Sequence, residues 1–408
     1  MLPIMDLRVA QWAEEFKCDV HTKTQEEDND ARRAEISRTF ISDTITVPTK
    51  DMYEYAVRAS LGDDVSFEPE TCALQSHIAK LTGKEAGLFM PTGTMSNQVA
   101  LRTHLQQPPY SVICDARAHA YRNETGGIAF HSGANVIPIF PDNDHHLTWE
   151  DIEPRIICGT EVHSAPTRVI LLENTLNGTV IPQQDVLDIS KNVREKDIVM
   201  HLDGARIWHV VVATGMSLKD LCEPFDSVSL CFSKGLGAPI GSCLVGTKEF
   251  ITRAKWFRKL FGGGMRQTGY LAAAAAYGLT HNFPLLPQVH GLANRMQHGL
   301  EEIGVGILTP AETCMVFYDP SPIGVEYWEV VERAAQLPNP IHINGSRLIM
   351  HIQTSPEAIE DFLELMKTLK IEKGQAGWSP DKQPRPARKG IYRDPYVKAV
   401  RPMVTVAT

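Results

Sequence analysis

The stretch SVSLCFSKGLGAPIGSCLVG, residues 227–246, decides the fold and the chemistry that the sequence predicts. Its first half is apolar, as in a buried strand, and it ends in Lys234, which glycines and a proline follow. A lysine at the end of a buried strand can simply extend its head group to solvent. It can also be held in a site, where partial burial makes its amine nucleophilic near neutral pH. The rest of the sequence distinguishes the two interpretations.

Short apolar runs alternate with helical stretches along the middle of the chain. Strands are expected at 110–115, 134–140, 167–175, 197–205 and 227–234, and helices at 71–83 and 183–196. Apolar strands that alternate with helices indicate an α/β fold with a mostly parallel sheet, covered by helices on both faces. In such sheets ligands bind at the carboxyl ends of the strands. The polar residues that end these strands are therefore the candidates for a site.

The sequence pattern divides the chain into four parts. We expect a charged N-terminal extension (1–40), a large domain (41–285), a small α+β domain (286–373) and a tail rich in proline and basic residues (374–408). The small domain includes an amphipathic helix at 355–373, which Ser355 caps. The tail has little to bury, so we expect it to be extended.

The composition argues against several classes of protein. The 408 residues carry a net charge of −9, and no basic patch favours binding to nucleic acid. No window approaches the roughly 20 apolar residues of a membrane span, and the N-terminus lacks the pattern of a signal peptide. The eight cysteines are scattered without a CxxC pair, which favours a reduced cytoplasmic protein. No histidine pair has the spacing of a helical zinc site, so we expect no metal.

Three features at strand ends fall in one predicted region. PTGTMSNQVAL (91–101) is a turn that opens into a helix, and backbone N–H groups at such a helix start bind phosphate. HLDGARIWH (201–209) places Asp203 at the end of one strand, and Lys234 ends the next. Taken separately, these are an ordinary capped helix, a structural ion pair and a solvated lysine. Together they meet the needs of pyridoxal 5'-phosphate: a phosphate cradle, a carboxylate for the pyridinium nitrogen, and a lysine that binds the cofactor covalently.

The sequence also resembles a known family. Motifs in the family's order run from about residue 40 to 356, and they include ISDTITVPT, GDDV, CDARAHAYRNETGGIA, HSAPTRVILLENTLNG, HLDGARIW, GGGMRQTG and RLIMHIQTS. These motifs resemble those of the threonine aldolases, and most closely those of the fungal members. The resemblance implies a fold-type I pyridoxal phosphate enzyme, similar to aspartate aminotransferase, in which the large domain binds the cofactor.

The resemblance assigns roles to the matching residues around the cofactor. Lys234 would bind the cofactor, Asp203 would pair with its pyridine nitrogen, and His119 would stack on its ring near the substrate hydroxyl. Gly93, Thr94 and Ser233 would hold the phosphate, and Arg266 of a neighbouring subunit would help to bind it. Arg206 would complete the cofactor site. A residue shared between subunits implies a homo-oligomer, a tetramer or a dimer.

The same resemblance implies a site for the carboxylate of an amino-acid substrate. Ser42, Arg206 and Arg347 would bind this group, since a planar guanidinium gives a carboxylate two parallel hydrogen bonds. His163 matches a second catalytic histidine, which helps to remove the proton of the β-hydroxyl group. A lone histidine is also commonly a structural residue, so both interpretations of His163 stay open.

The implied reaction is cleavage of a β-hydroxy-α-amino acid, L-threonine or L-allo-threonine, to glycine and an aldehyde. Three positions depart from the family: Ile41 replaces a usual arginine, Ser66, followed by Phe67, replaces a usual aromatic residue, and Cys314 replaces a usual asparagine. Ile41 and Ser66 lie in segments near the expected active site. They support an alternative, an alanine racemase like the fungal relatives that supply D-alanine to nonribosomal peptide assembly. Racemisation breaks the Cα–H bond instead of the Cα–Cβ bond.

Overall fold

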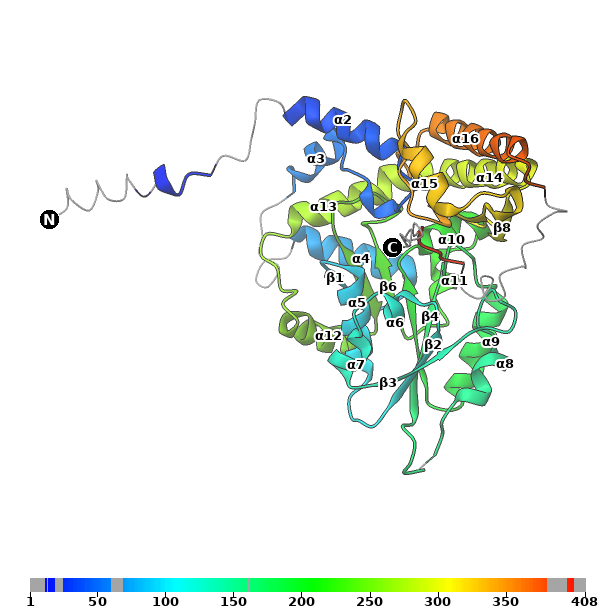
Figure 1. The fold of residues 1–408 in the computed structure, drawn as a ribbon. Coiled ribbons are helices and arrows are strands. Elements are labelled where there is room, and N and C mark those ends of the chain that lie inside the picture. The colour runs from blue at the N-terminus through cyan, green and yellow to red at the C-terminus, as the bar shows by residue number, and fades with distance from the viewer. Residues whose placement is uncertain are drawn as a thin grey trace, which may run out of the picture.

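The computed structural model describes residues 12, 14–18, 25–59, 69–159, 161–379 and 395–399, which form two sheets with helices around them (Figure 1). The larger sheet has the strand order β1 (Ala86–Met90), β7 (Ser242–Gly246), β6 (Ser227–Cys231), β5 (Val199–Gly204), β4 (Thr167–Glu173), β2 (Ser111–Asp115) and β3 (Asn135–Ile139). The strands from β6 to β3 pair in parallel, whereas β7 runs antiparallel to both β6 and β1. The predicted mostly parallel sheet is confirmed.

The register of the parallel strands brings charged residues together. β4 and β5 pair so that Glu173 lies opposite Asp203, and β5 and β6 pair so that Asp203 lies opposite Ser229. Glu173 and Asp203 are therefore neighbours at the carboxyl edge of the sheet. Lys234 follows the end of β6 at Cys231, so it lies at the same edge.

The helices cover both faces of this sheet, and the alternation of side chains along β1 shows the division. Leu88 and Met90 pack with α5 (Gly93–His104) and α12 (Lys248–Leu260) on one face. Phe89 points the other way, because successive side chains of a strand alternate. It belongs to the largest buried cluster, which α4 (Pro69–Thr82), α9 (Gln183–Arg194) and α10 (Ile207–Thr214) cover.

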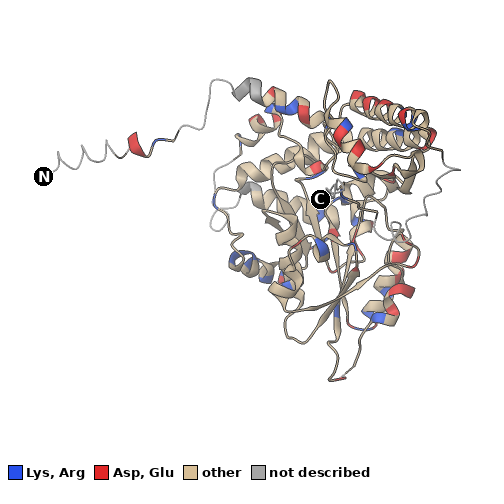
Figure 2. Cartoon of the chain, viewed as in Figure 1, with Lys and Arg blue, Asp and Glu red and all other residues tan. Residues whose placement is uncertain are grey.

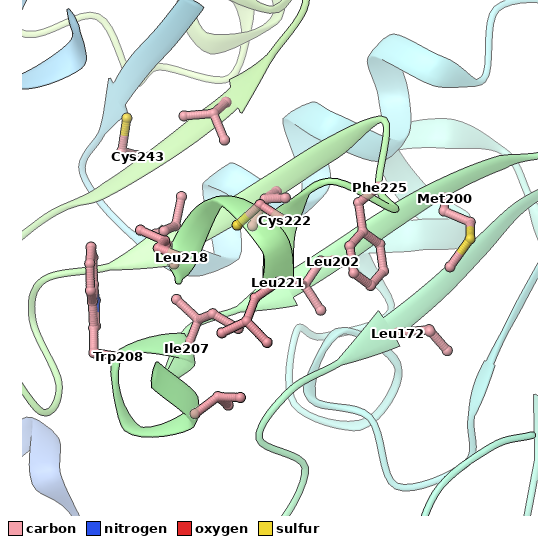
Figure 3. Packing of buried hydrophobic residues seen from close by; sticks show 14 of the residues in the cluster. Leu172, Met200, Leu202, Ile207, Trp208, Leu218, Leu221, Cys222, Phe225 and Cys243 are labelled. Carbon is pink, nitrogen blue, oxygen red and sulfur yellow. The ribbon is translucent and has the colours of Figure 1, made fainter. Parts of the chain in front are cut away.

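β5 divides its side chains between the core and the site. Met200 and Leu202 lie in the buried cluster with Leu172 of β4 and residues of α11 (Leu218–Cys222), as Figure 3 shows. His201 and Asp203 alternate with them and point to the face that α5 covers, where both contact Asn97. One face of β5 therefore builds the core, and the other face holds polar groups.

The second sheet follows the first in the sequence and is antiparallel, in the order β10 (Arg347–Ile349), β9 (Met315–Asp319) and β8 (Gly306–Thr309). It shares a separate buried cluster with α14 (Leu286–Ile303), α15 (Tyr327–Ala335) and α16 (Pro356–Gln375). Ser355 caps α16 as expected, with its Oγ accepting a hydrogen bond from the N–H of Ala358 at 3.0 Å. The boundaries that we place between the domains stay predictions.

Both sequence extensions contribute residues that contact the small domain. α2 (Gln25–Ser37) leads to Phe40, which is fully buried in the small-domain cluster and donates its N–H to the His342 carbonyl oxygen at 2.9 Å. Residues 395–399 pair with residues 344–346 and pack on the same cluster. The expectation of a tail with little to bury is therefore wrong for this segment, because its backbone and apolar side chains find partners. The GDDV motif, Ser66 and Phe67 lie outside the described residues.

The other described helices are short: α3 (Lys50–Ala56), α6 (His119–Arg122), α7 (Gly127–Ser132), α8 (Trp149–Ile152) and α13 (Gly269–Tyr277), with single 3-10 or π turns at 43–45, 153–155, 278–282, 283–285 and 321–323. Charged residues lie mainly on the outer helices, and few of them lie on the strands (Figure 2). None of the helices that the structure describes combines the length and the apolar character needed to cross a membrane.

Candidate active site

A cavity of about 260 Å³ lies at the carboxyl ends of β5 and β6, with the start of α5 as a further wall. Six of the residues predicted for the site line it: Gly93, Thr94, His119, Asp203, Ser233 and Lys234. A larger cavity of about 570 Å³, between α3, α4 and α13, contains Arg58 and His77, but the described residues that line it include neither a lysine nor a carboxylate. The six predicted residues that converge on the smaller cavity identify it as the candidate active site.

The start of α5 provides an anion-binding wall. Thr92 caps the helix, and its Oγ1 accepts a hydrogen bond from the N–H of Met95 at 3.0 Å. The first N–H groups of a helix have no intrahelical acceptor, so those of Gly93 and Thr94 can bind a phosphate. A Cβ atom at Gly93 would lie only 2.6 Å from Sγ of Cys231, so the glycine lets the helix start approach β6 closely.

Asp203 is buried, and two hydrogen bonds hold its carboxylate. Oδ2 accepts from Nδ2 of Asn97 at 2.8 Å, and Oδ1 accepts from the N–H of Ala205 at 3.1 Å. Asn97 in turn lies between Asp203 and His201, whose Nε2 is 3.3 Å from Oδ1 of Asn97. Burial lowers the pKa of His201 to about 4, so its ring stays neutral and adds no positive charge beside Asp203.

His119 begins α6, and a buried carboxylate orients its ring. Nδ1 lies 3.0 Å from Oε1 of Glu124, which is buried and also accepts a hydrogen bond from Asn97 at 3.0 Å. The hydrogen bond to Glu124 raises the pKa of His119, although partial burial and the charge of Lys234 act in the opposite direction. An ionised carboxylate can only accept hydrogen bonds, so Nδ1 carries a proton and Nε2 of the neutral ring is an acceptor.

Glu173 is a second carboxylate beside Asp203. Its Oε2 accepts a hydrogen bond from the backbone N–H of His119 at 2.6 Å. Burial and the charge of Asp203 raise the pKa of Glu173 to about 8, with the N–H of His119 and the charge of Lys234 as smaller opposing influences. At neutral pH Glu173 is therefore mainly protonated.

Arg206 follows β5, and its guanidinium group forms a two-point ion pair with Asp43. Nε and Nη2 of Arg206 donate to the two carboxylate oxygens of Asp43 at 2.8 and 2.6 Å. Burial alone would raise the pKa of Asp43, but the charge and hydrogen bonds of Arg206 outweigh it and hold this pKa well below its usual range. Ser42 is next to Asp43 and caps the turn at 43–45. A substrate carboxylate could therefore meet Arg206 only at the edge formed by Nη1 and the second N–H of Nη2.

Arg347, at the start of β10, keeps more of its donors available. Its Nη2 lies 3.5 Å from the carbonyl oxygen of Ile41, and its buried Nε has no hydrogen-bond partner among the described residues. Burial and the charge of Arg206 lower the pKa of Arg347. An anion beside both guanidinium groups would relieve this repulsion, so the structure supports the prediction that Arg347 binds a carboxylate.

Five predicted residues are not among those that line the cavity: Ser42, Arg206 and Arg347, described above, and His163 and Arg266. His163 is exposed in the loop before β4, whereas the cavity lies near the other end of that strand, at Glu173. Arg266 is exposed in the segment between α12 and α13 and is not among the residues that line the cavity. A single chain therefore leaves the expected roles of His163 and Arg266 as predictions.

Comparisons with known proteins agree with the chemistry of this site. The sequence profile of the beta-eliminating lyase family matches residues 39–321. The chain belongs to this family. A probable low-specificity L-threonine aldolase of Schizosaccharomyces pombe is 46% identical over 322 residues, which cover 79% of this chain and 84% of that protein. The alanine racemase TOXG of Cochliobolus carbonum is 34% identical over 335 residues, which cover 80% of this chain and 86% of that protein.

A solved structure of a Leishmania major threonine aldolase shares the fold of this beta-eliminating lyase family member. It aligns with a TM-score of 0.70 at 20% sequence identity and covers 81% of this chain and 99% of its own. The resemblance to threonine aldolases and the predicted fold class are both confirmed. The chain is a pyridoxal phosphate-dependent lyase.

The donors of the cavity fit pyridoxal 5'-phosphate. The start of α5 offers N–H groups for a phosphate, Asp203 offers a fixed carboxylate for a pyridinium nitrogen, and Lys234 offers an amine. The close approach of α5 to β6 at Gly93 keeps the phosphate wall within the same cavity. These are the residues that would hold the cofactor.

Three residues of the site, Asn97, Glu124 and Asp43, had no role in the interpretation of the sequence, although each lies close to a residue that did, whereas Glu173 was a strand-end candidate without an assigned role. Asn97 is one helical turn after Gly93, and Glu124 shares a motif with His119. Glu173 ends a predicted strand, and Asp43 follows Ser42. Polar residues within one turn of a predicted ligand were therefore the signal that could have identified them.

Two groups of side chains in the described part of the chain place three potential metal ligands within 4.8 Å of one another. The first is His119, Glu124 and Asp203, whose atoms surround the cavity described above. The second is Asp43, His209 and Cys314, and here the carboxylate is already paired with Arg206. Both groups therefore have another explanation in the structure, and we assign no metal to them.

The first prediction concerns the lysine that binds the cofactor. When the holoenzyme is reduced with borohydride and digested, the cofactor should be found on the peptide that contains Lys234, and Lys234→Ala should abolish this label. Lys84 is the matched control, because it is half-buried like Lys234, yet it lies outside the cavity and bonds to the carbonyl oxygen of Phe225. Lys84→Ala should retain the label. Label at an unchanged site in Lys234→Ala would show that another lysine carries the cofactor.

Proposed function

We propose that this protein cleaves β-hydroxy-α-amino acids of the threonine type, L-threonine or L-allo-threonine, to glycine and an aldehyde. The observation that carries this proposal is His119, which a buried carboxylate orients at the wall of a cavity that also holds Lys234 and Asp203. The identity to fungal threonine aldolases supports the same reaction.

Cleavage of the Cα–Cβ bond requires both a sink for electrons and a base for the β-hydroxyl proton. Pyridoxal 5'-phosphate, when bound, supplies the sink for electrons left on Cα. His119 supplies the base: its Nδ1–H donates to Glu124, so Nε2 can take the hydroxyl proton. Glu124 then stabilises the positive charge that develops on the ring.

The buried carboxylates maintain the charge that this chemistry needs. Asp203 is held by Asn97 and by the N–H of Ala205, and it would keep a pyridinium nitrogen protonated by favouring its positive charge. Glu173 is mainly neutral near pH 7, so it does not compete with Asp203 for that charge. At the other end of the site, Arg347 would bind the substrate carboxylate and so fix the orientation of the Cα bonds.

Racemisation of alanine is the second candidate. The identity to an alanine racemase supports it, and so does Ile41, a departure from the family whose backbone contacts Arg347. Racemisation needs a group that moves a proton on each face of Cα, and Lys234 and His119 would be those groups. The Glu124–His119 pair would serve either reaction, and the higher identity to threonine aldolases, 46% against 34%, favours the aldolase.

A homo-oligomer, a tetramer or dimer, is part of the proposal because Arg266 would complete the phosphate site of a neighbouring subunit. Arg266 is exposed, follows three consecutive glycines at 262–264 and does not line the cavity of its own chain. The chain has eight free cysteines in its described part, which suits the reducing cytoplasm as its location.

The assembly can be tested by light scattering, combined with assays of activity and of cofactor retention. The wild-type protein should elute as an oligomer, and Arg266→Ala should lose cofactor more readily on dialysis because one phosphate contact is missing. An active monomer that retains its cofactor would contradict the shared site.

The reaction can be tested by incubating the holoenzyme separately with L-threonine, L-allo-threonine and L-alanine, followed by chiral amino-acid analysis. Acetaldehyde and glycine should form from at least one threonine diastereomer, and L-alanine should keep its configuration. If neither diastereomer yields acetaldehyde while L-alanine is racemised, the aldolase proposal fails and the racemase replaces it.

The pH dependence of kcat tests the role of Glu124. His119 must be neutral to accept a proton, so activity falls as the pH drops through the pKa of His119, which Glu124 raises. Glu124→Gln removes the charge that stabilises the imidazolium, so the acid limb should move to lower pH. The value of kcat at high pH should also fall. The loss should be smaller than that expected from removing a general base itself, which is about 10²- to 10⁴-fold.

Gln98 offers a matched control for this experiment. Its Nε2 donates to the other oxygen of Glu124 at 2.6 Å, so Gln98→Met removes a hydrogen bond to Glu124 and leaves the carboxylate in place. The acid limb should move much less in Gln98→Met than in Glu124→Gln. An unchanged acid limb in Glu124→Gln would mean that His119 is not the base.

A further inference from the structure

The C-terminal segment 395–399 returns to the small domain next to the start of β10. The N–H of Ser346 donates to the carbonyl oxygen of Val397 at 2.9 Å, and the N–H of Ala399 donates to the carbonyl oxygen of Asn344 at 2.9 Å. Tyr396, Val397 and Ala399 pack against the buried small-domain cluster. The segment therefore forms an added, strand-like edge beside residues 344–346.

Two side-chain features show that this contact has a defined register. Ser346 is fully buried, and its Oγ donates to the carbonyl oxygen of Pro395 at 2.6 Å and accepts from the N–H of Val397 at 2.7 Å. A Cβ atom at Gly345 would lie 2.0 Å from the carbonyl oxygen of Val397, a distance no side chain could adopt. The glycine and the serine therefore accept this backbone in one position only.

This register places the ring of Tyr396 over Arg347. The guanidinium carbon of Arg347 lies 4.7 Å from the ring centroid, which is the geometry of a cation–π contact. Stacking uses the face of a guanidinium, while its hydrogen-bond donors lie in its plane. The buried Nε of Arg347 has no hydrogen-bond partner among the described residues, so this in-plane donor is left unsatisfied.

Arg206 shows the contrasting arrangement in the same region. Its in-plane donors Nε and Nη2 are used by Asp43, and the charge of Arg206 lowers the pKa of Arg347. Arg347 instead lies over an aromatic ring, and its Nε has no hydrogen-bond partner among the described residues. An arginine that is ordered before a ligand arrives loses less side-chain freedom on binding, which increases affinity.

We propose that Tyr396 is a positioning residue, which holds the guanidinium of Arg347 through its face so that the in-plane donors meet the α-carboxylate of the amino-acid substrate. The C-terminal segment is then a part of the substrate site, carried there by its pairing with Gly345 and Ser346. This inference rests on the proposed amino-acid site, but it does not depend on which bond of the substrate is broken.

The test uses the full-length holoenzyme and glycine, the product without a side chain, as a probe in isothermal titration calorimetry. Tyr396→Leu should weaken glycine binding by about 3- to 30-fold, the range of a cation–π contact. The KM for the amino-acid substrate should rise by a similar factor, with kcat much less affected. Tyr396→Phe keeps the ring and should bind glycine like the wild type.

Val397→Ala is the matched control, because it trims the packing of the same segment and keeps the ring of Tyr396. It should leave glycine affinity unchanged. In an Arg347→Ala background, Tyr396→Leu should have no further effect, because its effect passes through Arg347. Methylamine, which lacks a carboxylate, should bind the wild type and Tyr396→Leu equally. If Tyr396→Leu does not fold, Tyr396→Met, which keeps more apolar volume, replaces it with the same expected result.

Three results would overturn the proposal: unchanged glycine affinity in Tyr396→Leu, an equal loss in Val397→Ala or Tyr396→Phe, or an equal loss in the Arg347→Ala background. Failure of the proposed function has a different signature. A wild-type protein that binds glycine but releases no aldehyde from either threonine would exclude the aldolase, and the glycine affinities of the variants would still decide the role of Tyr396.

Discussion

Parallel pairing of β4, β5 and β6 concentrates charge at one edge of the sheet, and the rest of the site depends on how that charge is balanced. The register makes Glu173 and Asp203 neighbours, and two ionised carboxylates would repel each other there. Burial and this repulsion raise the pKa of Glu173 to about 8, so one carboxylate is mainly protonated near neutral pH. Asn97 and the backbone N–H of Ala205 hold the carboxylate of Asp203 in place. The fold thus determines which carboxylate remains available to a cofactor.

The two arginines show how similar residues acquire different roles from their neighbours. Asp43 pairs with Arg206 through both oxygens in a buried environment, and removing either partner would leave an uncompensated charge. This pair therefore ties the segment around residue 43 to the end of β5. Arg347 lies over the ring of Tyr396 instead, and its buried Nε has no hydrogen-bond partner among the described residues. One arginine is committed to the structure, and the other can bind a ligand.

The sequence predicted the parts of this molecule that depend on local pattern. The parallel strands, the cap at Ser355 and the meeting of Lys234 with Asp203 all follow from apolar runs and their polar ends. It missed the groups whose roles depend on contacts between distant segments. Nothing in the tail indicates that residues 395–399 pair beside Arg347, because that contact depends on a glycine and a serine some fifty positions earlier, at 345 and 346. For His163, the motif suggested a role in the site, but the contact is missing within one chain. His163 lies before the start of β4, whereas the cavity lies near the end of this strand.

A crystal structure of the protein with pyridoxal 5'-phosphate and glycine would test the central claim most directly, because it shows both ends of the site at once. The account predicts a carboxylate oxygen of Asp203 within hydrogen-bond distance of the pyridine nitrogen. It also predicts that the phosphate lies at the start of α5 and the glycine carboxylate at Arg347. A pyridine nitrogen without Asp203 as its partner, or a cofactor bound in another cavity, would contradict it.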